Sequence, residues 1–234
     1  MIKAVLFDLD GTLLPMDQDR FIQEYLRRLA IKMAPYGYEP ELLVKAIWKG
    51  TGAMVMNDGT LSNETVFWNT FSAVLGKDTR SDEPLFRAYY ENEFQLVQEV
   101  CGYAPMAAEA IREIKAMGCT VALATNPLFP AIATYSRSKW AGLDPEDFAL
   151  ITTYENSRHC KPNPAYYRDI LEILNLQPQE CLMVGNDVTE DMMAQNLGMH
   201  VFLLTDCIIN KDNRDICQYP QGSFPELLAF IRDL

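Results

Sequence analysis

Residues 4–12 read Ala-Val-Leu-Phe-Asp-Leu-Asp-Gly-Thr, an apolar run that ends abruptly in two carboxylates. A run that is hydrophobic throughout is typical of a strand that is covered on both faces. Asp8 and Asp10 then repel each other at the end of that strand, so the pair favours a cation or a reaction that needs both acids. Gly11 allows a sharp turn beyond them. A solvated turn after a buried strand is the alternative at this point.

The composition indicates a globular protein. Its 234 residues are 49% hydrophobic and 22% charged, which suits one large or two modest domains. The net charge of −12 argues against a nucleic-acid or anionic-membrane surface, so we expect no nucleic-acid or membrane partner. We find no signal peptide, no run long enough to span a bilayer, and six cysteines without CxxC spacing. We therefore expect a cytoplasmic protein, and no protein partner is evident.

Helical periodicity dominates about residues 16–99. Apolar residues recur there at three- and four-residue spacing, and no strand pattern interrupts them. The capping-box sequence that begins at Ser62 marks one helix start, and Gly50 with Gly52 is expected to stop the helix before it. The predicted helices cover residues 21–33, 41–48, a segment from 62 onward, and 83–98.

Strands and helices alternate in the rest of the chain, with predicted strands at 119–125, 148–152, 181–185 and 200–204. Helices are predicted between and after them, at 105–117, 130–140, 163–174, 189–196 and 224–233. This alternation predicts an α/β fold in which a Rossmann-like parallel sheet carries helices on both faces.

Polar residues follow the predicted strands. Ligands of open α/β sheets bind beyond the carboxyl ends of the strands, where this sequence places Asp8 and Asp10, Thr125-Asn126, and residues 185–187. Lys161 lies in the loop after the short strand, between two prolines that fix the backbone. Taken alone, each feature has a simpler interpretation. Lys161 could be solvated, Thr125 could simply end a strand, and the acids after residue 185 could lie at a helix N-terminus.

A divalent cation would relieve the crowding of acids at this edge. Asp187 and Asp191 are four residues apart and can approach one face of a helix, so with Asp8 and Asp10 they form a group of four carboxylates. Oxygen donors of this kind suit Mg²⁺, whereas the absence of Cys and His argues against zinc. An anionic substrate would meet its positive charge from the metal or Lys161.

The order Asp8-Leu-Asp10-Gly-Thr12, Thr125-Asn126, Lys161-Pro162 and Gly185-Asn186-Asp187 with Asp191 resembles the four motifs of the haloacid dehalogenase-like (HAD) hydrolase superfamily, over almost the whole chain. The resemblance implies that Asp8 is the nucleophile and Asp10 the general acid/base. It implies that Thr125 and Asn126 bind phosphate and that Lys161 steadies the nucleophile and the phosphoryl charge. It also implies Mg²⁺ held by Asp8, the Asp10 carbonyl, Asp187 and Asp191, the last directly or through water.

The resemblance also predicts the domain organisation. Residues 1–15 and 100–234 would form the HAD-like core, and residues 16–99 would form an inserted helical cap of the first-position type. Pro15 and Gly102 suit a hinge at the junctions. Within the cap, Trp48 and Lys49 are candidates to face the site, with Lys49 binding substrate; a buried tryptophan beside a solvated lysine is the alternative.

The predicted function is a Mg²⁺-dependent phosphatase that hydrolyses a small phosphorylated metabolite through an aspartyl-phosphate intermediate. Asp10 supports this prediction, because the dehalogenase and phosphonate-cleaving branches do not keep an acid at its position. One alternative is a phosphosugar mutase of the same fold, although the cap residues of that branch do not stand out. Another is a non-catalytic binding or regulatory protein on a HAD scaffold, against which the intact Asp8, Asp10, Lys161 and Asp187 argue.

Overall fold

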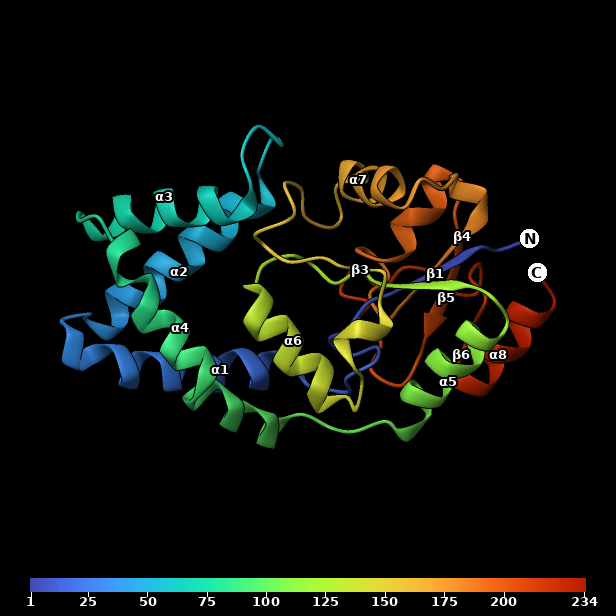
Figure 1. The fold of residues 1–234 in the computed structure, drawn as a ribbon, viewed down its shortest axis with the longest axis horizontal. Coiled ribbons are helices and arrows are strands. Elements are labelled where there is room, and N and C mark those ends of the chain that lie inside the picture. The colour runs from blue at the N-terminus through green and yellow to red at the C-terminus, as the bar shows by residue number, and fades with distance from the viewer.

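The structure is a computed structural model that describes residues 1–234, and its centre is a six-stranded parallel sheet (Figure 1). The strand order is β3-β2-β1-β4-β5-β6. The strands span β1 Ala4–Phe7, β2 Thr120–Leu123, β3 Leu150–Ile151, β4 Cys181–Gly185, β5 His200–Leu204 and β6 Gln221–Gly222. The predicted α/β class is confirmed; β6, only two residues long, was not predicted.

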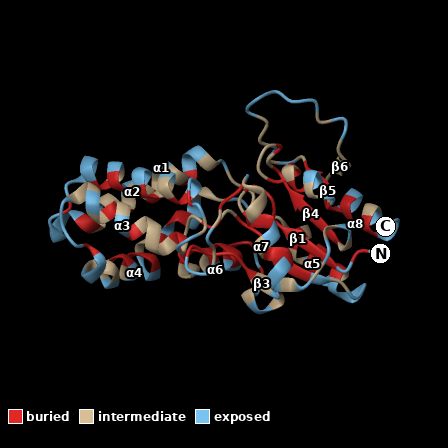
Figure 2. Cartoon of the chain, turned by 90° about the horizontal axis from the view of Figure 1, so that it is seen from above, coloured by how far each residue is buried: buried red, intermediate tan, exposed pale blue.

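Both faces of the sheet are covered, which explains why β1 is apolar throughout. Val5 and Phe7 belong to one hydrophobic cluster, which includes residues of α5 (Pro105–Ala116) and α8 (Phe224–Arg232). Ala4 and Leu6 point to the other, which includes residues of α7 (Pro164–Leu174). Figure 2 shows the strands as buried and the solvent side of the surrounding helices as exposed.

The register of the central strands determines where the polar residues that follow them leave the sheet. Phe7 of β1 is paired with Leu123 of β2 on one side and with Val184 of β4 on the other. The segments that follow these three residues therefore leave the sheet at the same edge. Helix α6 (Ala131–Trp140) follows β2 after a short loop.

A group of helices lies beside the sheet, at the end of the molecule away from the two chain termini (Figure 1). It consists of α1 (Gln18–Met33), α2 (Pro40–Val55), α3 (Asn63–Leu75), α4 (Glu83–Glu91) and a 3₁₀ helix over Glu93–Val100. Its two connections to the sheet pair with each other, because Met16 and Cys101 form an antiparallel bridge and the Gly102 N–H donates to the Pro15 carbonyl at 2.7 Å. The division at residues 16–99 stays a prediction.

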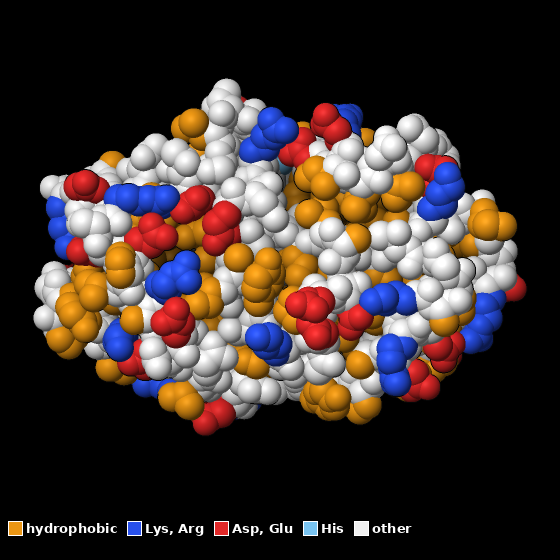
Figure 3. Space-filling view, in the orientation of Figure 1, with side chains coloured by type: hydrophobic (Ala, Val, Ile, Leu, Met, Phe, Trp, Pro, Cys, Tyr) orange, Lys and Arg blue, Asp and Glu red, His pale blue; other side chains and the backbone are white.

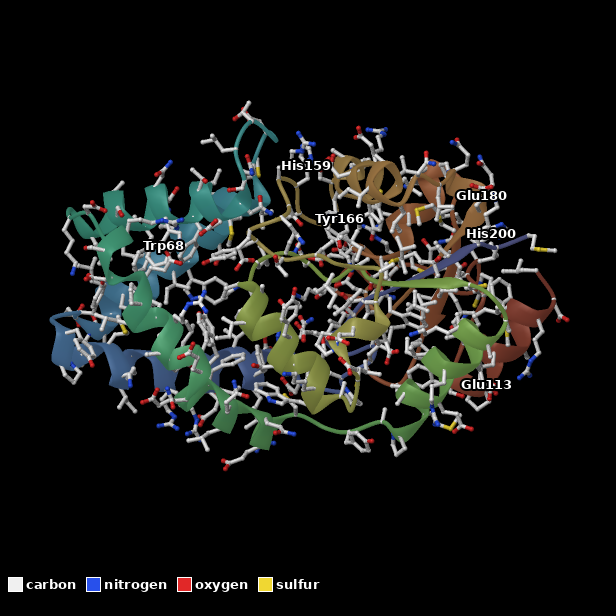
Figure 4. The ribbon with its side chains drawn as sticks, viewed as in Figure 1. Trp68, Glu113, His159, Tyr166, Glu180 and His200 are labelled. Carbon is white, nitrogen blue, oxygen red and sulfur yellow. The ribbon has the colours of Figure 1, made fainter.

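The α2–α3 connection also contacts the core. Asn63 is fully buried; its backbone N–H donates to the Ser157 carbonyl at 2.8 Å, and its side-chain amide lies 3.4 Å from the Pro127 carbonyl. The Glu64 N–H donates to the Tyr154 carbonyl at 2.8 Å. Figure 4 shows His159, on the same core loop, beside this connection. The helical group is therefore bound to two loops at the carboxyl edge of the sheet.

Three predicted helices differ from the structure. Helix α2 does not stop at Gly50 but continues to Val55. Gly50 instead allows α3 to pack closely against α2, because a Cβ at this position would lie 2.6 Å from the Phe67 ring. The helix predicted over 83–98 breaks at Asn92, whose side chain donates to the Ala88 carbonyl at 2.8 Å. The helix predicted over 189–196 is a 3₁₀ helix, Met192–Leu197, after a tight turn. No helix is both long and apolar enough to cross a membrane.

Candidate active site

Lys161 lies between two carboxylates at the carboxyl edge of the sheet. Its ammonium donates to Asp8 Oδ1 at 2.9 Å and to Asp191 Oδ1 at 2.6 Å, and its side chain is completely buried. The three residues come from segments that are far apart in the sequence, so the fold brings together three of the predicted site residues. Burial opposes the charged form of Lys161, but Asp191 and Asp8 raise its pKa well above the ordinary value. It therefore remains an ammonium.

Gly185 allows Asp191 to reach this position. A Cβ at residue 185 would collide with the Asp191 carboxylate. Asp191 Oδ2 accepts the Asp187 N–H at 3.0 Å, so both of its oxygens are engaged within the protein. Burial raises the pKa of Asp191, while the Lys161 ammonium opposes that rise.

Asp187 organises the turn after β4. Its Oδ1 atom accepts the backbone N–H groups of Thr189 at 2.7 Å and Glu190 at 2.8 Å. A carboxylate that caps a turn in this way holds a fixed orientation. Asp187 is thus fixed close to Asp191, with its second oxygen outside these two contacts.

Thr12 and Asn186 connect the first and fourth motifs, and neither was predicted to have a role of its own. The Thr12 hydroxyl lies 3.0 Å from Asn186 Oδ1 and 3.3 Å from Asp8 Oδ2, so its one proton can serve either acceptor. Gly11 has φ +88°, as the predicted sharp turn requires, and a Cβ there would collide with the Asn186 amide. For Thr12, the available sequence signal was its position in the first motif, two residues after Asp10.

Asp10 forms an ion pair that the sequence did not reveal. Its Oδ2 atom accepts from Arg137 Nη1, and Arg137 on α6 is fully buried against the Phe129 ring, with its guanidinium carbon 4.4 Å from the ring centroid. Burial raises the pKa of the Asp10 carboxyl, Arg137 lowers it and the neighbouring Asp8 charge raises it further, for a net rise. The only sequence signal was the position of Arg137 on the helix face of Ala133 and Thr134.

Thr125 and Asn126 lie at the same edge, as predicted. Thr125 is buried, and its carbonyl accepts the hydroxyls of Thr152 at 2.7 Å and Tyr166 at 2.9 Å. The Asn126 amide donates to Glu190 Oε2 at 2.9 Å. Burial raises the pKa of Glu190 to about 7, although Lys161 opposes the rise. This network orients the Asn126 side chain and leaves its Oδ1 atom for another partner.

The donors of this edge fit a hydrated divalent cation. Two of its buried acceptors, Asp10 Oδ1 and Asn126 Oδ1, have no hydrogen-bond partner. Buried polar atoms rarely lack a partner, so these two suit a ligand, ordered water or a cation. No three His, Cys, Asp or Glu side chains converge as the ligands of a bare ion would, since Lys161 lies between Asp8 and Asp191. Mg²⁺ that keeps several of its waters is compatible with this arrangement.

Lys49, the remaining predicted site residue, is exposed on α2. No ion pair or hydrogen bond ties its ammonium to the residues described above. Its substrate-binding role stays a prediction.

Comparison with known proteins agrees with the order of the motifs. The model of the haloacid dehalogenase-like hydrolase family matches residues 2–198. The chain is 29% identical over 206 residues to a phosphoglycolate phosphatase of Aliivibrio fischeri, covering 87% of this chain and 84% of that protein. It is 27% identical over 197 residues to the pyrophosphatase PpaX of Bacillus cereus, covering 84% of this chain and 80% of that protein.

The fold is similar to that of a solved 2-haloacid dehalogenase from Pseudomonas syringae, with a TM-score of 0.63 and 20% identity over 100% of this chain and 99% of that one. Similarity at that level of identity concerns the fold alone. The family-model match spans more than half of the chain, so the protein belongs to the haloacid dehalogenase-like hydrolase family.

Proposed function

We propose that this hydrolase is a Mg²⁺-dependent phosphatase that cleaves a small phosphate monoester through an aspartyl-phosphate on Asp8. The observation that carries the proposal is the buried Asp8–Lys161–Asp191 group at the carboxyl edge of the sheet. Two relatives are named for phosphoglycolate and pyrophosphate, both phosphorus substrates. The retained acid at Asp10 favours phosphate ester chemistry over dehalogenation.

The geometry supports a division of labour between the two aspartates. Asp8 would attack phosphorus, and the Lys161 ammonium beside it would stabilise the charge on the transferred phosphoryl group. The raised pKa of Asp10 suits a group that gives a proton to the leaving oxygen and later takes one from water. Thr125 and Asn126 would hold phosphoryl oxygens.

Mg²⁺ would be held by the Asp8 carboxylate, the Asp10 carbonyl and the Asp187 carboxylate. Asp191, whose two oxygens are engaged by Lys161 and the Asp187 N–H, would contribute through water and by keeping Lys161 in place. When bound, the ion supplies positive charge to the phosphoryl oxygens, which lowers the barrier to attack by an anion.

The direct test is the Asp8→Asn variant, assayed with p-nitrophenyl phosphate and Mg²⁺. We expect kcat to fall by about three orders of magnitude or more, since the change removes the nucleophile and a cation ligand together. Asp212→Asn, an exposed aspartate that pairs only with Arg214, is the matched control and should keep full activity. Near-wild-type turnover by a folded Asp8→Asn protein would refute the mechanism, and an inactive wild type would favour a non-catalytic role.

A further inference from the structure

A cavity of about 500 Å³ lies between the helical group and α6. Residues of α1, α2, α3 and α4 form one side, and α6 with the loop before it forms the other. Of its 23 lining residues, 16 are hydrophobic. Figure 3 shows hydrophobic side chains gathered along the middle of the molecule, between the helical group and the sheet. A cavity of this size and character is typical of a small-molecule site.

The cavity wall is continuous with the segments that carry the proposed phosphate site. Leu128, which lines it, follows Asn126 by two residues and donates its N–H to the Asn126 carbonyl at 2.8 Å. Tyr154 also lines it and clusters with Leu128 and Cys160, the residue before Lys161. The loop that carries Asn126 therefore also lines the cavity, and the loop that carries Lys161 contributes Tyr154, seven residues earlier.

The lining is mostly apolar, and its charged groups balance one another. Tyr25 and Tyr90 pair their hydroxyls at 3.0 Å, so these two side chains present their rings. The Trp68 indole nitrogen is buried, so this side chain also presents its ring to the cavity. Figure 4 shows Trp68 within the helical group. The charged lining residues are two acids and two bases, so they do not favour an anion (Glu83, Arg87, Lys139, Glu155).

We infer that this cavity receives an apolar leaving group, and that the enzyme prefers phosphate monoesters of aryl or medium-chain alkyl alcohols over those of small acids. The inference rests on the proposed phosphatase function and specifies its substrate class. A two-carbon carboxylate would leave most of this space unfilled, and its charge would meet a lining whose acids and bases balance. Each apolar carbon that enters the cavity gains transfer free energy from water.

The test compares n-alkyl phosphates of increasing length, from ethyl to octyl. We expect kcat/KM to rise about fourfold per added methylene, the equivalent of the transfer free energy of one CH₂ group, until the cavity is filled. Thr51→Trp, a half-buried position on α2 that lines the cavity, should flatten this rise, whereas Val55→Trp on the same helix outside the cavity should preserve it.

A binding measurement with 1-naphthol, which carries no phosphate, separates the cavity from catalysis. Wild type and Val55→Trp should bind the probe, and Thr51→Trp should bind it at least tenfold more weakly. Activity on ethyl phosphate with no rise along the series, or binding unaffected by Thr51→Trp, would overturn the apolar-substrate inference while the phosphatase proposal stands. A folded protein inactive on every phosphate ester would overturn the phosphatase proposal itself, even if naphthol binds.

Discussion

The catalytic edge of the sheet and the cavity beside it are built on opposite principles. At the edge, segments that follow β1, β3 and β4 hold the charged groups of Asp8, Lys161 and Asp191 at 2.6–2.9 Å from one another, and the sheet determines where these segments begin. In the cavity, five helices contribute mostly apolar side chains, and the packing of the helices determines where these side chains lie. Under the proposed function, bond breaking and substrate choice would reside in separate parts of the molecule.

This separation has a measurable consequence. A change in the polar group formed by Asp8, Lys161 and Asp191 should slow every substrate by a similar factor, because each substrate presents the same phosphoryl group. A change in the cavity should alter only substrates with a large leaving group. Variants of the polar group that discriminate between leaving groups by size would break the comparison.

The largest effect is expected for Lys161→Met. The change leaves Asp8 and Asp191 buried without their shared cation, so the free energy of unfolding should fall by about 3–5 kcal/mol. Turnover should fall by orders of magnitude on ethyl and octyl phosphate alike. Urea unfolding and steady-state assays measure the two effects. Adding Asp191→Asn should recover part of the stability but no activity; recovery of activity would remove Lys161 from the mechanism.

Metal removal should act nearly as strongly. Exhaustive EDTA treatment should abolish activity, and added Mg²⁺ should restore it. Asp187→Asn should keep the turn, because an amide oxygen can still accept the Thr189 and Glu190 N–H groups, while the Mg²⁺ concentration needed for half-maximal activity rises. Full activity in EDTA would contradict the cation requirement, and an unchanged Mg²⁺ dependence in the variant would exclude Asp187 as a ligand.

A smaller and selective effect is expected for Arg137→Met. Arg137 acts through Asp10, so its loss should matter where the leaving oxygen needs a proton. We expect kcat to fall about tenfold on alkyl phosphates and within about twofold on p-nitrophenyl phosphate, whose leaving group is stable as an anion. Arg137→Lys should restore part of the loss. An equal loss on both substrates would mean that Arg137 only supports the fold.

The sequence predicted the residues whose positions depend on the sheet. Because strand ends meet at one edge, the sequence could predict a common location for six of the candidate site residues, and the structure does bring their segments together there (Asp8, Thr125, Asn126, Lys161, Asp187 and Asp191). Their roles stay predictions. Arg137 was missed because its contact with Asp10 depends on how α6 rotates and packs, which helical periodicity does not specify. Gly50 was misread for the same reason, since its role is contact with Phe67.

The cavity could not be predicted for a related reason. Its walls come from residues up to about 130 positions apart, and only their packing creates the space. Trp48 was a candidate to face the site, and it lines the cavity; its neighbour Lys49, the other candidate, does not, since adjacent helix positions point about 100° apart.

The proposed mechanism requires a covalent bond between Asp8 and phosphorus. Asp10→Asn should accumulate that species on p-nitrophenyl phosphate, whose departure needs no acid, while hydrolysis of the intermediate lacks its base. Quenching wild type and this variant during turnover and reducing them with borohydride converts an acyl phosphate into an alcohol. We predict homoserine at position 8, detected by peptide mass spectrometry, with more in Asp10→Asn than in wild type. Unmodified Asp8 in both proteins, in samples that were forming product when quenched, would contradict the account.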